Sequence, residues 1–159
     1  MRAPRLVQML REKSDAMSGD LVTKIRASAK GVDLLTIVPE SEQKQCTRAI
    51  YEDLTGWLGS KSDAVLEQRY VALGKRRASQ GVPASQLFWA VSIAQEYLWD
   101  YMQQECLLED PVEFWGGVLL LRSLTGFFAR VVYFTLIGYE QAARNESTAL
   151  DYIGRRRSA

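Results

Sequence analysis

The chain has 159 residues, with 20 basic and 19 acidic side chains and no histidine. This length suits a single domain with its own core, and the balanced charge provides no field that would attract nucleic acid or an anionic membrane. Without histidine the chain cannot form a Ser-His-Asp or Cys-His catalytic centre, a histidine-ligated zinc site or a histidine-held haem.

The remaining reactive residues also point away from metal and redox chemistry. Cys46 and Cys106 lie far apart and form no metal or redox motif, so we expect buried, reduced thiols. Glu109, Asp110 and Glu113 stand at a helix start, where acids cap more often than they chelate a cation. The N-terminal sequence MRAPRLVQMLREK has no apolar signal core. We therefore expect a cytoplasmic protein without a cofactor or a metal.

Apolar residues recur every three or four positions along most of the chain, which predicts helices. The first helix is expected over residues 3–29. Val32–Val38 is short and apolar, but a single strand would have no partner, so we expect a buried connection there. Pro39 opens a helix that Gly59 ends, and a further helix begins near Ser60 or Ser62 and ends at Gly81. The polar residues of that helix are expected to face water: Glu67, Lys75, Arg76 and Arg77.

The last two helices are predicted at Ala84–Cys106, which is rich in aromatic residues, and at Asp110–Arg144. No strand-like alternation or internal repeat is present. The fold class is therefore all-α, a single-domain bundle of about five helices with a long C-terminal helix. We assign residues 1–144 to the helical domain and 145–159 to a polar, partly disordered tail.

The helix at 110–144 is apolar over most of its circumference and keeps only one narrow polar strip. Arg122 and Arg130 divide it into short apolar pieces, which disfavours a membrane span of roughly 20 uncharged residues. A soluble helix with this much apolar surface needs a partner as well as its own core. We therefore expect a homodimer rather than a monomer with a rich core. The predicted interface comprises Trp115, Leu119, Tyr133, Phe134 and Ile137.

The same helix and its predecessor carry a candidate ligand pocket. Aromatic side chains would line it, and an arginine would hold a ligand carboxylate by a bidentate contact. The candidate residues are Arg122, Arg130, Trp89, Trp99, Phe127 and Phe128. The competing interpretation is that the aromatic residues fill the core and that the arginines form ion pairs with Glu96, Asp100 or Glu105.

Two segments carry a resemblance to a known family. These are LGKRRASQGVPASQLFWAVSIAQEYLWDYM, with its Gly81-Val82-Pro83 turn, and FFARVVYFTLIGYEQAAR near the C-terminus. Their order resembles the N-terminal sensory domain of stressosome RsbR-type proteins, the RsbT co-antagonists, over about residues 5–144. The resemblance implies a bacterial, cytoplasmic, dimeric domain with a globin-like or related fold and no haem. It also implies that a signal passes through the last helix to a C-terminal STAS or kinase domain. This chain departs from that pattern, because only 15 residues follow Arg144.

The leading hypothesis is a non-enzymatic signalling domain that senses a small apolar or carboxylate ligand or docks a regulatory protein partner. The alternatives are a structural or assembly subunit that buries its apolar helices in a larger complex, and a binder of apolar ligands or lipid. No nucleophile is paired with a base in this sequence, so an enzyme is disfavoured.

Overall fold

The computed structural model describes residues 3–28, 32–105 and 111–157. These residues form only helices, which confirms the all-α class: α1 (Ala3–Ala27), α2 (Val32–Ile37), α3 (Glu40–Ser60), α4 (Asp63–Ser79), α5 (Ala84–Glu105) and α6 (Pro111–Arg157). The globin-like arrangement stays a prediction.

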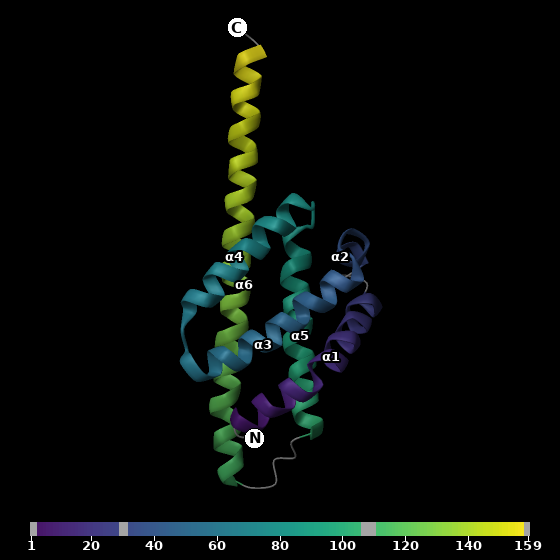
Figure 1. Cartoon of the computed structure of the whole chain (residues 1–159), viewed down its shortest axis with the longest axis vertical. Coiled ribbons are helices and arrows are strands. Elements are labelled where there is room, and N and C mark those ends of the chain that lie inside the picture. Colours follow the sequence, from purple (N-terminus) through teal and green to yellow (C-terminus); the bar gives the residue numbers. More distant parts are fainter. Residues whose placement is uncertain (1–2, 29–31, 106–110, 158–159) are drawn as a thin grey trace.

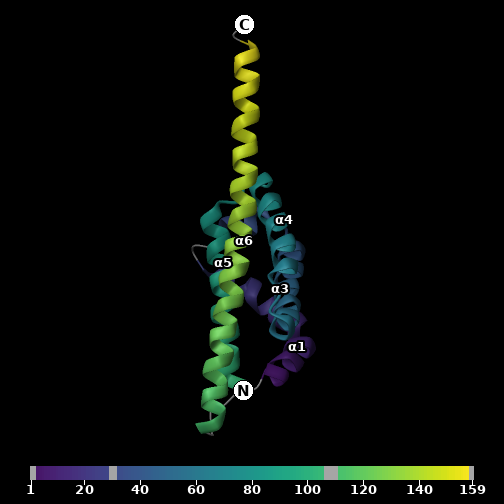
Figure 2. The ribbon, with the colours of Figure 1, turned by 90° about the vertical axis from the view of Figure 1, so that its left-hand side faces the viewer.

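The helices form two layers. In Figures 1 and 2, α5 and α6 run antiparallel in one layer, and α1, α3 and α4 form the other. The core lies between the layers and includes Leu54 of α3, Leu98 of α5 and Leu124 of α6, all of which are buried. Apolar residues recur every three or four positions in the helices of both layers, and this spacing places their side chains on one side of each helix. The apolar sides of the two layers face each other and form the core.

The short helix α2 corrects the expectation of a connection without regular structure. The Val38 N–H donates to the Leu34 carbonyl at 2.8 Å, which is the spacing of a helical turn. The side chains of Leu34 and Val38 are buried as expected, whereas those of Thr36 and Ile37 are exposed, so the expected burial is confirmed only in part. A helical turn satisfies its own backbone hydrogen bonds, whereas a lone strand would leave them without partners.

Two glycines allow α4 and α6 to approach within backbone contact. A Cβ atom added at Gly74 would lie 1.9 Å from the Thr135 carbonyl oxygen, and one at Gly138 would lie 2.0 Å from the Val71 carbonyl oxygen. No side chain fits at either distance, so only glycine permits this crossing. The contact joins α6 to α4 more tightly than ordinary side-chain packing would.

The turn between α4 and α5 follows the Gly81-Val82-Pro83 sequence. Gly81 has a φ of 75°, its N–H donates to the Ala78 carbonyl at 2.9 Å, and the Val82 N–H donates to the Arg77 carbonyl at 3.1 Å. This left-handed glycine ends α4 and buries Val82. The turn also fixes the last helical residues of α4, including Arg77.

Helix α6 passes the boundary expected at Arg144 and continues to Arg157, beyond the rest of the bundle (Figure 1). Residues 145–157 contain no proline and a single glycine, Gly154, so nothing in their sequence ends the helix. The polar tail expected over this stretch is therefore helical. Ser158 and Ala159 lie outside the described residues.

Among the described residues, one stretch, Val118–Asn145, is long and apolar enough to cross a membrane by length and composition alone. This is a weak indication, because a core helix of a soluble protein has the same composition. Only 33% of its most apolar window is buried within the chain, which leaves much of its apolar surface uncovered.

Candidate functional site

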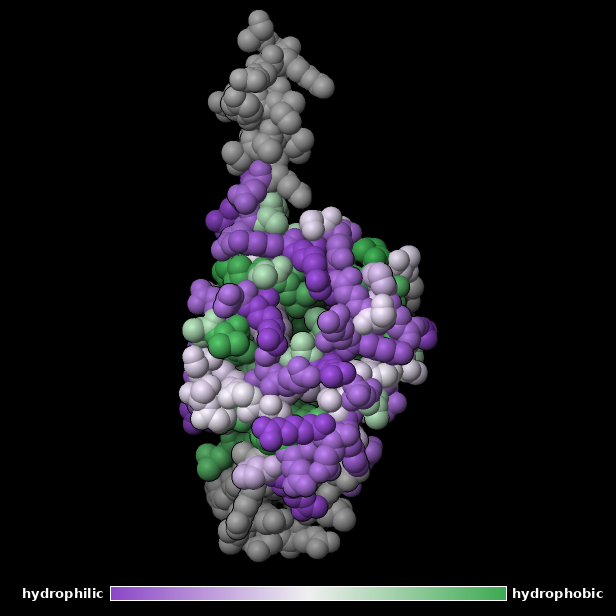
Figure 3. Space-filling model, viewed as in Figure 1, coloured by the Kyte–Doolittle hydropathy of each residue, from purple (hydrophilic) through white to green (hydrophobic). Residues whose placement is uncertain are grey.

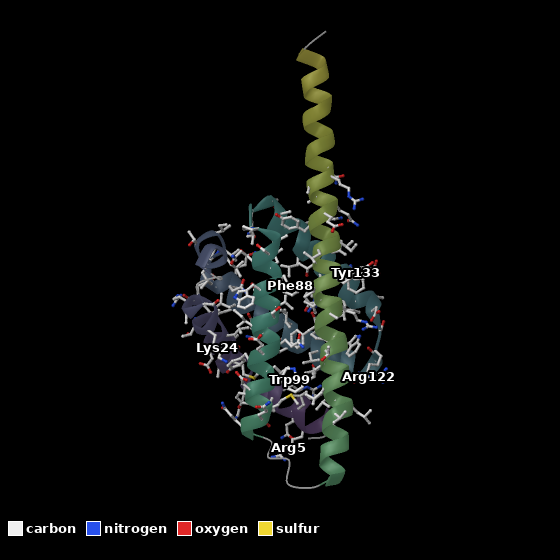
Figure 4. The ribbon with its side chains drawn as sticks, turned by 180° about the vertical axis from the view of Figure 1, so that it is seen from behind. Arg5, Lys24, Phe88, Trp99, Arg122 and Tyr133 are labelled. Carbon is white, nitrogen blue, oxygen red and sulfur yellow. The ribbon has the colours of Figure 1, made fainter. Side chains whose placement is uncertain are left out.

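The outward side of the α5–α6 layer carries exposed apolar residues. Leu119 is 67% exposed and Tyr133 is 59% exposed, and Phe88 on α5 is also exposed. Leu119, Arg122 and Tyr133 follow helical spacing along one side of α6. Figure 4 shows the layer from this side, with Phe88 on α5 and Arg122 and Tyr133 on α6. We call these residues, Phe88, Leu119, Arg122 and Tyr133, the outer face.

The opposite side of the molecule is different in character. The space-filling view in Figure 3 shows a mostly hydrophilic surface over the layer of α1, α3 and α4. Ion pairs tie that surface together, among them Arg48 with Asp15 at 2.9 Å. The surface of this layer is thus mostly polar, although Val65 of α4 is an exposed apolar residue there.

The structure divides the predicted interface residues. Leu119 and Tyr133 lie on the exposed side of α6. Phe134 and Ile137 are half-buried, and the Phe134 ring lies edge-on to Tyr133 with ring centres 5.4 Å apart. The Trp115 side chain lies outside the described residues. The uncovered part of α6 is thus centred on Leu119 and Tyr133.

The aromatic residues predicted to line a pocket do not gather in one place. Phe127 and Phe128 are fully buried in the core, and Phe127 packs against Trp57 with ring centres 5.9 Å apart. Trp89 and Trp99 are half-buried on α5, and the Trp89 Nε1–H donates to the Ser28 hydroxyl of the α1 end at 2.8 Å. Phe127 and Phe128 face the core, whereas Trp89 and Trp99 lie at the edge of the bundle. The four rings therefore do not line a common pocket.

The two arginines of α6 also differ. Arg130 is half-buried, and its Nε donates to Asp63 Oδ1 at 2.7 Å while its guanidinium lies 5.4 Å from the Trp57 ring centre. Arg122 is exposed, and no ion pair of its side chain is found in the part of the chain that the structure describes. The ion-pair interpretation is confirmed for Arg130, with a different partner from those expected. Asp100 instead pairs with Lys24 at 2.9 Å.

Sequence reasoning missed a buried charge at the end of α4. Arg77 was expected to face water but is only 2% exposed. Its Nη1 donates to the Glu42 carboxylate and, at 2.7 Å, to Gln80 Oε1. Its Nη2 has no hydrogen-bond partner in the described chain. The helical spacing of Leu66, Tyr70, Gly74 and Arg77 was the available signal, since all four are buried on one face of α4.

Charge around Arg77 is not balanced. Glu42 receives both Arg77 and Arg76, the latter at 2.9 Å, so two cations share one carboxylate. Burial raises the pKa of Glu42, but the hydrogen bond from Arg77 and the charges of Arg77 and Arg76 outweigh it and hold that pKa below the ordinary 4.5. Burial also raises the pKa of the Cys46 thiol, against the opposing effect of Arg77 beside it. Cys46 is therefore a poor nucleophile, although its side chain is half-buried rather than buried as expected.

Arg77 lines a small cavity inside the bundle, with a volume of about 30 Å³. A larger open groove of about 360 Å³ lies on the surface between α3 and α4, and it has Arg69 and Arg76 among its lining residues. Cys46 and Leu73 line both spaces and therefore form the wall between them.

The described residues contain no group of three or more Cys, Asp and Glu side chains placed to hold a metal ion. The site features of this helical bundle are thus an uncovered apolar face, a buried charged cluster and a long projecting helix. Such features are typical of a regulatory or interaction domain.

Comparison with known families agrees with that class. The RsbT co-antagonist protein rsbRD N-terminal domain family matches residues 15–157. The chain therefore belongs to this family of stressosome-associated regulatory domains. Searches of curated proteins and of solved structures give no match.

Proposed function

We propose that this chain is a non-enzymatic, cytoplasmic signalling domain from a bacterium that forms a homodimer through the outer face of α5 and α6. The observation that carries the proposal is the exposure of Leu119, Tyr133 and Phe88 on the layer of α5 and α6, set against an opposite side that is mostly hydrophilic. Contiguous apolar patches on soluble domains mark interaction sites, because leaving them in water is unfavourable.

A twofold contact through this face would bring two copies of α6 together, since an isologous interface uses the same patch on both subunits. Each α6 then continues beyond its own bundle to Arg157. A change in how the two bundles pair would reach that end through a continuous helix, which transmits displacement with little bending. We propose that the projecting end of α6 is the output and that it docks a regulatory partner.

The experiment is size-exclusion chromatography with light scattering on the wild-type chain and on Leu119→Glu, Tyr133→Glu and Val65→Glu. Val65 is an exposed apolar residue of α4 and provides the matched control. We expect the wild type at twice the 18.0 kDa chain mass and Val65→Glu unchanged. The other two variants are expected at the monomer mass, because a carboxylate buried in an apolar contact is costly.

A monomeric wild type, or a dimer that survives both outer-face variants, would contradict the proposal. A second candidate is an assembly subunit that buries this face in a larger complex, which the family's association with the stressosome favours. Wild-type species well above twice the chain mass, dissociated by Leu119→Glu, would support that candidate instead.

A further inference from the structure

The cavity beside Arg77 lies where all six helices meet. Its lining includes one or more residues from each helix: Leu21, Leu34, Thr47, Arg77, Ala94 and Thr135. Most of the remaining lining is aliphatic, and the lining contains no carboxylate. A mostly apolar space with a few polar groups is the usual composition of a small-molecule site.

Arg77, which is among the residues that line this space, leaves part of its hydrogen-bonding capacity unused. The guanidinium has five N–H donors, and its Nη2 lies buried without an acceptor in the described part of the chain. Buried donors without a partner are rare because they lose their hydration and receive nothing in return. Glu42 also pairs with Arg76, which is 56% exposed, so the carboxylate is shared and does not belong to the buried Arg77 alone. Both features call for an anionic acceptor.

We propose that this cavity binds a small carboxylate, with one carboxylate oxygen accepting from Arg77 Nη2. The volume of about 30 Å³, which holds roughly one or two water molecules, limits the ligand to the smallest carboxylate, formate, and acetate would enter only if the aliphatic lining moved outward. Arginine is the side chain best suited to this role, because its planar fork matches the carboxylate and keeps its charge when buried. The aliphatic lining would meet the hydrogen or methyl group of the ligand.

The surface groove supplies a route to the cavity. Arg69 and Arg76 stand at the groove, where they pair with Asp53 and Glu42, and the groove is bordered by the wall formed by Cys46 and Leu73. Rotation of these two side chains would connect the two spaces. This route would let a ligand reach a site that residues of all six helices line.

A ligand in this cavity would touch the elements that the proposed signal needs. Thr135 lines the cavity, and its backbone carbonyl lies against Gly74 where α4 and α6 cross. A bound carboxylate would therefore favour one spacing of α4, α5 and α6 over others. This sensing role depends on the proposed function, whereas the binding site does not.

The test is a titration of the methyl-labelled chain with sodium formate and with sodium acetate, followed by nuclear magnetic resonance. Sodium chloride holds the ionic strength constant. We expect saturable shifts of the Leu87 and Val131 methyl groups, which line the cavity. Arg77→Lys should weaken binding about tenfold or more, since lysine keeps the charge but loses the forked donor.

A second variant keeps the test decisive if Arg77→Lys fails to fold. Ala94→Val fills the cavity and leaves Arg77 and Glu42 untouched, so it should abolish the shifts. Val65→Ala is the control and should bind as the wild type does. The proposal is overturned by shifts that survive Ala94→Val or by shifts confined to residues of the surface groove. It is also overturned if no saturable change occurs, and Arg77 Nη2 would then be hydrogen-bonded to water. Saturable binding to a chain that light scattering finds monomeric would uphold the site and overturn the dimeric function.

Discussion

The two sides of α6 are both apolar in sequence but have opposite roles in the structure. Toward α4, the helix is sealed by Gly138 and by the contact of Gly74 with Thr135, and the fully buried Phe127 packs against Trp57 of α3. On the outer face, Leu119 and Tyr133 meet no other part of the described chain that would cover them. The comparison teaches that apolar content measures how much surface must be buried, whereas the position around the helix decides what buries it. Phe127 and the glycine contacts face other helices of the same chain, and the side that carries Leu119 and Tyr133 is left for a partner.

The largest expected contrast is between Phe127→Ala and Leu119→Ala. Phe127 is fully buried, so its truncation should lower the free energy of unfolding by about 3–5 kcal/mol through lost burial and a residual cavity. Leu119→Ala should change that free energy by less than about 0.5 kcal/mol at low protein concentration. Urea denaturation measures both. A larger effect of Leu119→Ala at high concentration would report the dimer, whereas equal losses at low concentration would break the comparison.

The glycine crossing provides the next contrast. Gly138→Ala would bring a methyl group 2.0 Å from the Val71 carbonyl oxygen, so α4 and α6 must separate. We expect a loss of about 2–3 kcal/mol, near the upper end for overpacking, because backbone rather than a flexible side chain must move. Gly56→Ala is the control, since nothing lies within 4 Å of its added methyl group. It should stabilise helix α3 by about 0.5–1 kcal/mol, and a loss there of the same size as at position 138 would contradict the crossing.

A smaller contrast separates the arginines of α6. Arg130→Met should cost about 0.5–1 kcal/mol, because its pair with Asp63 at 2.7 Å is only half-buried and is screened by solvent. Arg122→Met should cost nothing measurable in the monomer. Chemical denaturation of both variants checks this, and a double-mutant cycle of Arg130 with Asp63 isolates the pair. A coupling energy of zero would show that the contact does not stabilise the fold.

The last expected effect is a pH dependence at the α3–α4 junction. The pKa of Glu42 is held below 4.5 in the folded chain by Arg77 and Arg76, despite the opposing effect of burial. The stability contributed by this carboxylate is therefore fully present above pH 4.5 and is lost as the pH falls through the lowered folded value. The difference in unfolding free energy between the wild type and Glu42→Gln should shrink over that window. A difference that stays constant with pH would assign the effect to packing alone.

Much of this fold was predictable because it depends on local periodicity. The helices expected over 39–59 and 84–106 correspond to α3 and α5, and Gly81 ends α4 as its position in the turn indicated. The short helix α2 was missed because its six residues, four of them apolar, are too few for periodicity to distinguish a turn of helix from a connection. The continuation of α6 past Arg144 was missed because the polar composition of residues 145–157 was taken to mark a helix end. That stretch contains no proline, so nothing in it stops the helix.

The sites were harder to predict, because helix phase shows which residues share a face but not what that face meets. Phe127 and Trp99 share an aromatic character that suggested one cluster, yet one lies in the core and the other at the rim. Arg130 was correctly expected in an ion pair, but its partner came from the start of α4 rather than from α5. The burial of Arg77 depends on α3 lying across the end of α4, where Glu42 can reach it.

By itself, the order of residues determined an all-helical chain without histidine chemistry and with more apolar helix surface than one core needs. Local spacing, capping and turn residues act over a few positions, so they can be read along the chain. Only the tertiary structure decided which side of α6 is sealed and that a charged arginine lies where six helices meet. Those outcomes depend on contacts between residues far apart in sequence, and backbone contact at two glycines selects among the arrangements that the periodicity alone would allow.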